Sequence, residues 1–519
     1  MASDNSQNSK RIAKNTLLLY VRMLFIMAVN LYMSRVVLNT LGVVDFGIYN
    51  VIAGVVAMFA IISGSLSAAI SRFITFELGR GNLSKQKAIF SSSITIQVAI
   101  AVVILIVAEL IGPWFLNNKM NIPADRILAA NWVLQCTIFS FCFTLIGVPF
   151  NASIIAHEKM SAFAYISILE VLLKLAVVYA LLISPIDKLI SYAILLLVVV
   201  IFIQSIYGIY CRVKFEECRM SFSFDRDLLK KMTGFAGWNF IGSSASILRD
   251  QGVNIVINLF CGPVVNAARG VAMQICHAVT GFVNNFMTAL NPQITKSYAT
   301  GDFDYMNTLV FKGARFSFYL LLILSLPIFL ETELIMDLWL KGMVPEHSIM
   351  FVRLILIFTL IESVSGPLIT LMLATGNIKK YQIIAGGTNM MNLPISYILL
   401  RWCGFADFPE ITFIVAIIIS VLVLLCRLYL LKEMVNLDVQ RFTKEVLVNV
   451  VLVSLISAFA PVCIHLMCGN SVIEIILEIF VCFIFSALTI LFVGCNKEER
   501  AMIYSQCGKI RNKILSNEK

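Results

Sequence analysis

Apolar segments long enough to cross a membrane recur along this chain and leave little room for any other kind of fold. Hydrophobic residues make up 59% of the 519 residues, charged residues only 13%, and the mean hydropathy is +0.90. A bilayer requires roughly 20 apolar residues per helix. On this basis we expect an all-α polytopic membrane protein with about fourteen transmembrane helices. The expected spans are 16–39, 46–70, 87–112, 126–150, 161–182, 188–211, 233–260, 269–292, 311–331, 348–373, 382–400, 411–431, 444–466 and 472–494.

The distribution of lysine and arginine predicts the orientation of these spans. With the N-terminus in the cytoplasm, alternating spans place about 29 of the 40 basic residues on the cytoplasmic side. About six fall outside, namely Lys119, Arg126, Lys188, Arg269, Lys341 and Arg401. We therefore expect both termini in the cytoplasm. The net charge of +10 then reflects topology and an anionic inner leaflet rather than binding to nucleic acid.

Short motifs reappear about 220 residues further along the chain. Three sets are related in this way: Ile74-Thr75 and Gly81-Asn82 with Ile294-Thr295 and Gly301-Asp302; Asn39 and Gly42 with Asn258 and Gly262; Pro149 and Ala156 with Pro367 and Ala374. Duplicated halves are common in transporters. We expect two pseudo-symmetric six-helix lobes, 1–211 and 233–431, joined by a cytoplasmic linker at 212–232. Two additional helices and a C-terminal tail fill 432–519.

Short loops and scattered cysteines argue against several kinds of function. The longest external loop, 332–347, holds about sixteen residues, too few for the extramembrane platform that a polysaccharide polymerase or ligase needs. The thirteen cysteines form no Cys-x-x-Cys motif and no cluster with histidine. We therefore expect a transporter rather than an enzyme, with no cofactor and no metal. A purely structural partner of other envelope enzymes stays open as an alternative.

Five of the basic residues within expected spans are candidates for a binding site: Arg22, Arg35, Lys174, Arg249 and Arg353. Burying a cation in hydrocarbon costs a few kcal/mol, so each should face a wet cavity, pair with a carboxylate or reach the interface. Lys174 follows Glu170 by four residues, on one helical face. Arg22 and Arg249 are the least compensated by local sequence, since Asp250 points about 100° away from Arg249 on a helix.

The repeat brings Arg22 and Arg249 to equivalent elements of the two halves, where they can face one cavity. Guanidinium groups match phosphate oxygens, so we predict an anionic substrate bound by Arg22, Arg249, Lys174 and Arg35. Glu362, with no basic neighbour in the sequence, and Asp250 are candidates for coupling to an ion. His277 is a candidate proton relay or a hydrogen-bonded core histidine. The alternative is that the arginines only hold helices together, through Asp45, Glu362 or backbone carbonyls.

Several segments resemble a known family. They are Gly237-Trp238-Asn239, Arg249-Asp250-Gln251-Gly252, Asn266-Ala267-Ala268-Arg269-Gly270, Ala156-His157-Glu158-Lys159-Met160 and the stretch from Arg72 to Asn82. These look like bacterial polysaccharide biosynthesis flippases, the Wzx-type O-antigen and capsule lipid-linked oligosaccharide translocators. That group belongs to the multidrug/oligosaccharidyl-lipid/polysaccharide (MOP) exporter superfamily.

The resemblance implies two MATE-like six-helix lobes with two extra helices and alternating access. It also implies a substrate of undecaprenyl diphosphate carrying an oligosaccharide, with the prenyl tail in the membrane lipids, and work beside other polysaccharide-assembly membrane proteins. The main alternative is a MATE-like, ion-coupled exporter of small molecules. Drug cations would favour carboxylates in the first span, whose charges are Arg22 and Arg35 instead. This difference favours an anionic substrate.

Overall fold

The chain is helical throughout the part that the structure describes. The structure is a computed structural model that describes residues 2–57, 60–119, 122–183, 187–219, 226–340, 344–467, 472–501 and 504. Within these ranges no β-strand occurs, as expected where backbone polar groups must be satisfied without water.

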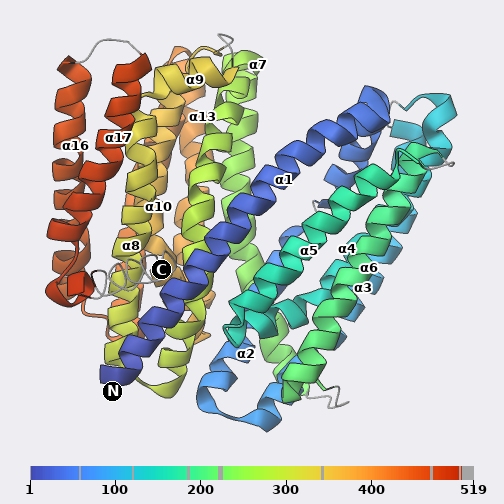
Figure 1. Cartoon of the computed structure of the whole chain (residues 1–519), viewed down its shortest axis with the longest axis horizontal. Helices are drawn as coiled ribbons and strands as arrows, with labels where there is room; N and C mark the ends of the chain where they lie inside the picture. Colours follow the sequence, from blue (N-terminus) through green and yellow to red (C-terminus); the bar gives the residue numbers. More distant parts are fainter. Residues whose placement is uncertain are drawn as a thin grey trace, which may run out of the picture. The chain divides into compact units, whose positions relative to one another are not determined.

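The longer helices in Figure 1 are α1 (Ala2–Ala57), α2 (Ala60–Arg80), α3 (Leu83–Lys119), α4 (Ile127–Ala156), α5 (Met160–Ala180), α6 (Lys188–Lys214), α7 (Arg226–Thr300), α8 (Phe303–Leu330), α9 (Thr332–Leu340), α10 (Ser348–Thr375), α13 (Asn392–Trp402), α14 (Ile411–Val435), α16 (Asn449–Met467) and α17 (Val472–Thr489). Shorter ones are α11 (Lys379–Tyr381), α12 (Gly387–Met390), α15 (Val439–Phe442) and the π-helical segments η3 (Gln382–Gly386), η5 (Thr443–Val448) and η6 (Ile490–Gly494).

Ten helical segments of the described chain are long and apolar enough to cross a membrane. They run over Leu83–Trp114, Ala124–Ala156, Met160–Ala180, Lys188–Lys214, Phe303–Leu330, Ser348–Thr375, Lys379–Trp402, Ile411–Val435, Val439–His465 and Leu477–Gly494. The other four expected spans fall within α1, α2 and α7. The prediction of an all-α polytopic membrane protein is confirmed.

Two long helices change direction within their length. Gly42 breaks α1 with φ 80° and ψ 168°, between the first and second expected spans. In α7, Nη2 of Arg269 donates to the backbone carbonyl of Asp250 at 3.0 Å. A straight helix would hold two residues nineteen apart roughly 28 Å from each other. The chain therefore turns back between residues 250 and 269, as the two expected spans at 233–260 and 269–292 require.

The chain forms two compact units. The first contains Met1–Ser244, Thr288–Phe303 and Leu373–Gln382, and the second contains Ala245–Met287, Asp304–Met372 and Ile383–Lys519. The C-terminal ends of α7 and α10, which belong to the second half of the repeat, therefore pack with the first unit. The division into two six-helix lobes joined at 212–232 stays a prediction.

Small side chains let the helices of the first unit approach closely. A buried cluster of this unit joins α1, α3, α4 and α6 through Ile52, Ala101, Ala130, Val133 and Ala193. Such residues suit membrane bundles, where helix association depends on close packing rather than on a hydrophobic driving force. This packing fixes the first unit around α4.

The turns after α2 and α7 repeat the same backbone geometry 220 residues apart. Gly81 and Gly301 both have positive φ, 69° and 78°. Each donates its N–H to the carbonyl three residues earlier, and the following residue, Asn82 or Asp302, donates to the carbonyl five residues earlier. This is the Schellman pattern that ends a helix on glycine. The motif that repeats in the sequence at these two turns therefore also repeats in backbone conformation.

Equivalent residues of the repeat also contact each other. A Cβ placed on Gly79 of α2 would lie 3.0 Å from Cβ of Ala299 of α7, which is 220 residues later. Contacts between equivalent residues occur near the axis of a two-fold arrangement. Gly79 thus lies where the ends of the two related helices approach most closely, and any larger side chain would force them apart.

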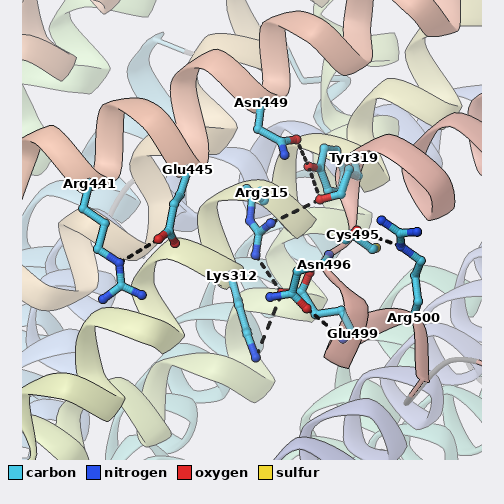
Figure 2. A network of polar contacts seen from close by, with 11 residues as sticks. Lys312, Arg315, Tyr319, Arg441, Glu445, Asn449, Cys495, Asn496, Glu499 and Arg500 are labelled. Atoms are coloured by element: carbon cyan, nitrogen blue, oxygen red, sulfur yellow. Dashed lines mark hydrogen bonds and ion pairs between the residues drawn. The ribbon is translucent and has the colours of Figure 1, made fainter.

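The last two helices of the second unit attach to α8 through a polar network, shown in Figure 2. Nη2 of Arg315 lies 2.6 Å from Oε1 of Glu499, and its Nη1 donates to the carbonyl of Gly494 at 3.1 Å. The hydroxyl of buried Tyr319 donates to the same carbonyl at 3.1 Å and also to Asn449. In Figure 1, α16 and α17 lie side by side. Their ends are therefore held to α8 by buried hydrogen bonds.

Candidate functional site

A cavity of about 340 Å³ lies inside the second unit. Segments of α7, α8, α10, α13 and α14 surround it. Its charged and polar lining residues are Arg249, Asp250, Arg269, His277, Thr280, Asn284, Thr359, Glu362, Ser363, Asn392 and Thr412. Helix cores that face lipid are apolar, so this concentration of polar groups marks a candidate functional site.

Arg249 lines this cavity, but it is paired with the residue beside it. Its Nε lies 2.8 Å from Oδ1 of Asp250 and its Nη2 lies 3.3 Å from Oδ2. Its Nη1 donates to Oδ1 of Asn389 at 3.4 Å, and its guanidinium lies 5.3 Å from the ring centroid of Phe358. The expectation that Asp250 points away from Arg249 is therefore wrong. The arginine side chain is long enough to fold back over the 100° between adjacent residues.

Arg269, which was expected in an external loop, is a second cation in the same cavity. Only 7% of the residue is exposed, and it donates to the carbonyl of Asp250. Its guanidinium lies 5.3 Å from the ring centroid of Phe413. The turn within α7 brings Arg269 beside Arg249, a proximity that no local pattern predicts. In the sequence, only the resemblance to the known family, whose motifs include both arginines, pointed to it.

Glu362 lines the cavity from α10 and lies next to a buried cation. Nη1 of Arg427 is 3.7 Å from its Oε2, and the Arg427 side chain is 4% exposed. The expectation that Glu362 lacks a neighbouring cation is therefore wrong, because packing of α14 against α10 brings Arg427 next to it. Among the described atoms, Oε1 of Glu362 and both Nε and Nη1 of Arg427 have no hydrogen-bond partner. The two side chains are close together, but several of their polar atoms have no hydrogen-bond partner among the described residues.

The cavity combines cations and carboxylates rather than cations alone. Arg249 and Arg269 are balanced by Asp250 and Glu362 around its lining, with Arg427 behind Glu362. His277 and Asn284, both exposed, face the same space. Such a site can bind an anion through guanidinium groups, and it can also exchange a proton or a cation at a carboxylate.

Arg22 and Lys174 lie in the first unit, on α1 and α5. The Arg22 guanidinium lies 4.4 Å from the ring centroid of Phe163, and its Nε has no hydrogen-bond partner in the described part of the chain. Nζ of Lys174 lies 2.6 Å from Oε1 of Glu170, which confirms the ion pair expected from their spacing. Glu170 also interacts electrostatically with Arg22. The side chain of Arg35 lies outside the described residues, and the expected approach of Arg22 to Arg249 stays a prediction.

A buried carboxylate in the first unit was missed by the sequence analysis. Glu158 follows α4, and its side chain is 2% exposed. Its carboxylate accepts from Nε of Arg11 at 2.8 Å, from Nε2 of Gln293 at 2.6 Å and from Nζ of Lys296 at 2.7 Å. Glu158 also has a positive φ of 57°. It thereby joins α4 to α1 and to the end of α7.

Comparison with known proteins gives the family. Residues 12–298 match the family described as polysaccharide biosynthesis protein. The chain belongs to that family. Residues 247–398, which include most of the cavity, also match the family described as MatE. The chain is thus a multi-pass membrane protein of the MOP superfamily, as its resemblance implied.

One curated relative is an uncharacterized membrane protein, EpsK, of Bacillus subtilis (strain 168), 23% identical over 300 residues. The match covers 56% of this chain, and the chain spans only 58% of the length of that relative. The relationship supports a membrane protein of the same family, and it assigns no substrate.

Solved structures of MATE transporters share the fold. An outward-facing multidrug resistance MATE family transporter of the MOP superfamily matches with a TM-score of 0.72 and 13% identity, over 83% of this chain and 97% of that chain. A MATE protein in a bent conformation matches with a TM-score of 0.71 and 13% identity, over 83% and 98%. A MOP superfamily transporter from Pyrococcus furiosus matches with a TM-score of 0.68 and 12% identity, over 82% of this chain and 96% of that chain. For that transporter, reversed polarity of the binding pocket suggests a different function.

Proposed function

We propose that this protein is a flippase for undecaprenyl-diphosphate-linked oligosaccharide. It would move the lipid from the cytoplasmic to the periplasmic leaflet of the bacterial inner membrane by alternating access, with both termini in the cytoplasm. The product would supply the assembly of O-antigen, capsule or exopolysaccharide. The observation that carries the proposal is the pair of arginines, Arg249 and Arg269, on one cavity of a polysaccharide biosynthesis family member.

A diphosphate suits this pair of arginines for a simple electrostatic reason. Each guanidinium presents a planar fork of N–H donors to phosphate oxygens, and a diphosphate offers more charge than the single carboxylate of Asp250. In the described arrangement Asp250 holds Arg249 in place. Substrate would compete with Asp250 for that guanidinium, so Asp250 would keep the empty site ordered without blocking it.

Arg22 would supply a further contact from the first half of the repeat. Its Nε has no described hydrogen-bond partner, and it rests on an aromatic ring rather than on a carboxylate. A guanidinium held in this way keeps most of its hydrogen-bonding capacity for a ligand. Lys174, already paired with Glu170, and Arg35 are assigned weaker, steering contributions.

Ion coupling would use the carboxylates of the cavity. Glu362 shares a poorly satisfied contact with buried Arg427, so gain or loss of a proton there would alter the pairing of α10 with α14. Asp250 is the second candidate, through its contact with Arg249. We assign Glu362 the larger role because its partner comes from a different helix.

The experiment is to delete the gene in its host and to measure where lipid-linked oligosaccharide accumulates. We expect accumulation on the cytoplasmic leaflet and loss of surface polysaccharide, both restored by the wild type. Arg249→Ala and Arg22→Ala should fail to restore export at normal membrane abundance. Arg401→Ala removes an exposed arginine at the end of α13 and is the matched control. Unchanged polysaccharide export in the deletion strain would refute the proposal.

A second candidate function is ion-coupled export of a small cationic molecule. The observation that favours it is the presence of both Asp250 and Glu362 on the cavity, together with the MATE-like fold. Drug accumulation assays separate the two functions. The exporter predicts that Asp250→Asn lowers resistance to cationic compounds while leaving polysaccharide export intact, and the flippase predicts no change in resistance.

A further inference from the structure

Two glutamates and a histidine from distant parts of the chain converge within the second unit. Glu331 lies between α8 and α9, His465 lies near the end of α16, and Glu478 lies in α17. Nδ1 of His465 is 3.0 Å from Oε1 of Glu331, 3.1 Å from Oε1 of Glu478 and 3.3 Å from Oε2 of Glu478. One atom of each residue lies within 4.8 Å of both others. Since Glu331 and His465 are 134 residues apart, no sequence spacing predicts this cluster.

The burial of this cluster leaves a negative charge without a matching cation. The side chains of Glu331 and Glu478 are 8% and 3% exposed, while His465 is 41% exposed. Among the described residues, no lysine or arginine lies within 4.0 Å of either carboxylate. A single ring nitrogen carries at most one proton, so it cannot satisfy three carboxylate oxygens at once. Two buried carboxylates beside one imidazole need a further positive charge, either a shared proton or a bound cation.

We propose that Glu331, His465 and Glu478 bind a divalent transition-metal ion. Zn²⁺ takes carboxylate oxygen and imidazole nitrogen at about 2.0–2.2 Å, and tetrahedral ligand atoms then lie roughly 3.3 Å apart. The distances of 3.0–3.3 Å from Nδ1 to the carboxylate oxygens agree with that separation. The imidazole favours Zn²⁺ and similar ions over Mg²⁺ and Ca²⁺, which prefer oxygen ligands alone.

Three protein ligands leave one position for water, as in open zinc sites. The exposed edge of His465 gives an ion from solution a path to the two buried carboxylates. Because α16 and α17 have no counterpart in the repeat, their attachment to the rest of the unit depends on contacts of their own. The ion would fasten both helices to the end of α8, at a place separate from the network of Figure 2.

The test is metal binding by the purified full-length protein in detergent, without a histidine tag and after treatment with a chelator. Titration with Zn²⁺ should show one saturable equivalent and a rise in the melting temperature. His465→Ala and Glu478→Gln should each weaken Zn²⁺ binding by more than the roughly tenfold that loss of an outer-shell partner costs. X-ray absorption of the loaded wild type should show nitrogen and oxygen ligands and no sulfur.

His347→Ala is the matched control. Nδ1 of His347 lies 2.6 Å from Oε1 of Glu410, a similar pair with no third ligand found among the described residues. This variant should bind Zn²⁺ like the wild type. The proposal is overturned if the folded wild type shows no saturable Zn²⁺ binding, or if both ligand variants bind as tightly as the control. Gel filtration reports folding of each variant, and Glu478→Gln, which keeps shape and size, suffices should His465→Ala misfold. Flipping activity enters none of these readouts.

Discussion

Glu158 and Gly376 take the same left-handed backbone conformation at equivalent turns, 218 residues apart, with φ of 57° and 78°. Each donates its N–H to the carbonyl three residues earlier. For a residue other than glycine this conformation costs roughly 1–2 kcal/mol. In the first half the strain is offset by the buried contacts of Glu158 with Arg11, Gln293 and Lys296. The two halves therefore form the same turn with different residues: a glutamate held by buried contacts in the first half and a glycine in the second.

We predict that Glu158→Ala lowers the free energy of unfolding by about 1–3 kcal/mol, because it leaves the partners of a buried carboxylate unsatisfied. Glu158→Gly loses the same contacts but relieves the turn, so it should be more stable than Glu158→Ala by roughly 1 kcal/mol. Thermal unfolding in detergent measures both. An alanine variant as stable as the glycine variant would show that the turn is not strained.

The reverse substitution tests the second half. Gly376→Ala should destabilise the protein by about 1–2 kcal/mol. A Cβ there would press on the guanidinium of Arg72, which donates to the carbonyl of Ala374 at 3.0 Å. Gly387→Ala is the control, since it lies in α12 with no atom within 4 Å of the new Cβ, and alanine favours a helix. Equal melting temperatures for the two variants would contradict the prediction.

Variants of Glu362 and Arg427 show whether the contact between them only stabilises the fold or also couples transport to an ion. Glu362→Gln leaves the buried guanidinium of Arg427 uncompensated, which typically costs about 3–5 kcal/mol. The double variant Glu362→Gln with Arg427→Gln should regain stability. If Glu362 also couples transport to an ion, the double variant should fold but lose the effect of a pH gradient on transport. Full gradient dependence in that folded variant would exclude Glu362 from coupling.

The pairing of His157 with Glu217 predicts a dependence of stability on pH. Burial acts to raise the pKa of Glu217, but the hydrogen bond with His157, a backbone hydrogen bond and the nearby charges of His157 and Lys87 together outweigh it, so this pKa lies below its ordinary value. A carboxyl with a lowered pKa stabilises the fold above its unfolded pKa of about 4.3 and loses that contribution as pH falls through the lower folded value. The melting temperature of Glu217→Gln should therefore fall less steeply than that of the wild type as the pH decreases below about 5. Glu216→Gln, at an exposed neighbour, should follow the wild type, and a Glu217→Gln curve parallel to it would contradict the linkage.

Much of the fold could be predicted because a bilayer allows few solutions. Apolar runs gave the spans, the spacing of Glu170 and Lys174 gave their ion pair, and the echo of Gly81 in Gly301 marked two equivalent turns. These features depend on residues close in the sequence or on a repeat that the sequence displays.

The site was harder to predict because its contacts join distant segments. Arg269 was expected in an external loop and Arg427 was not among the candidates, yet tertiary packing buries Arg269 against the backbone of Asp250 and Arg427 next to Glu362. Asp250 was expected to point away from Arg249, but the long arginine side chain folds back and reaches the carboxylate of Asp250. Local spacing carries no information about such contacts, so the sequence predicted the presence of charges without their partners.

The most direct test of the flippase proposal is the movement of a fluorescent undecaprenyl-diphosphate-linked oligosaccharide in vesicles holding the purified protein. A membrane-impermeant reductant bleaches only the outer leaflet, so flipping appears as additional bleaching. We expect protein-dependent bleaching with the wild type and with Arg401→Ala, and none with Arg249→Ala. Vesicles with the folded wild type that bleach no further than empty vesicles would contradict it.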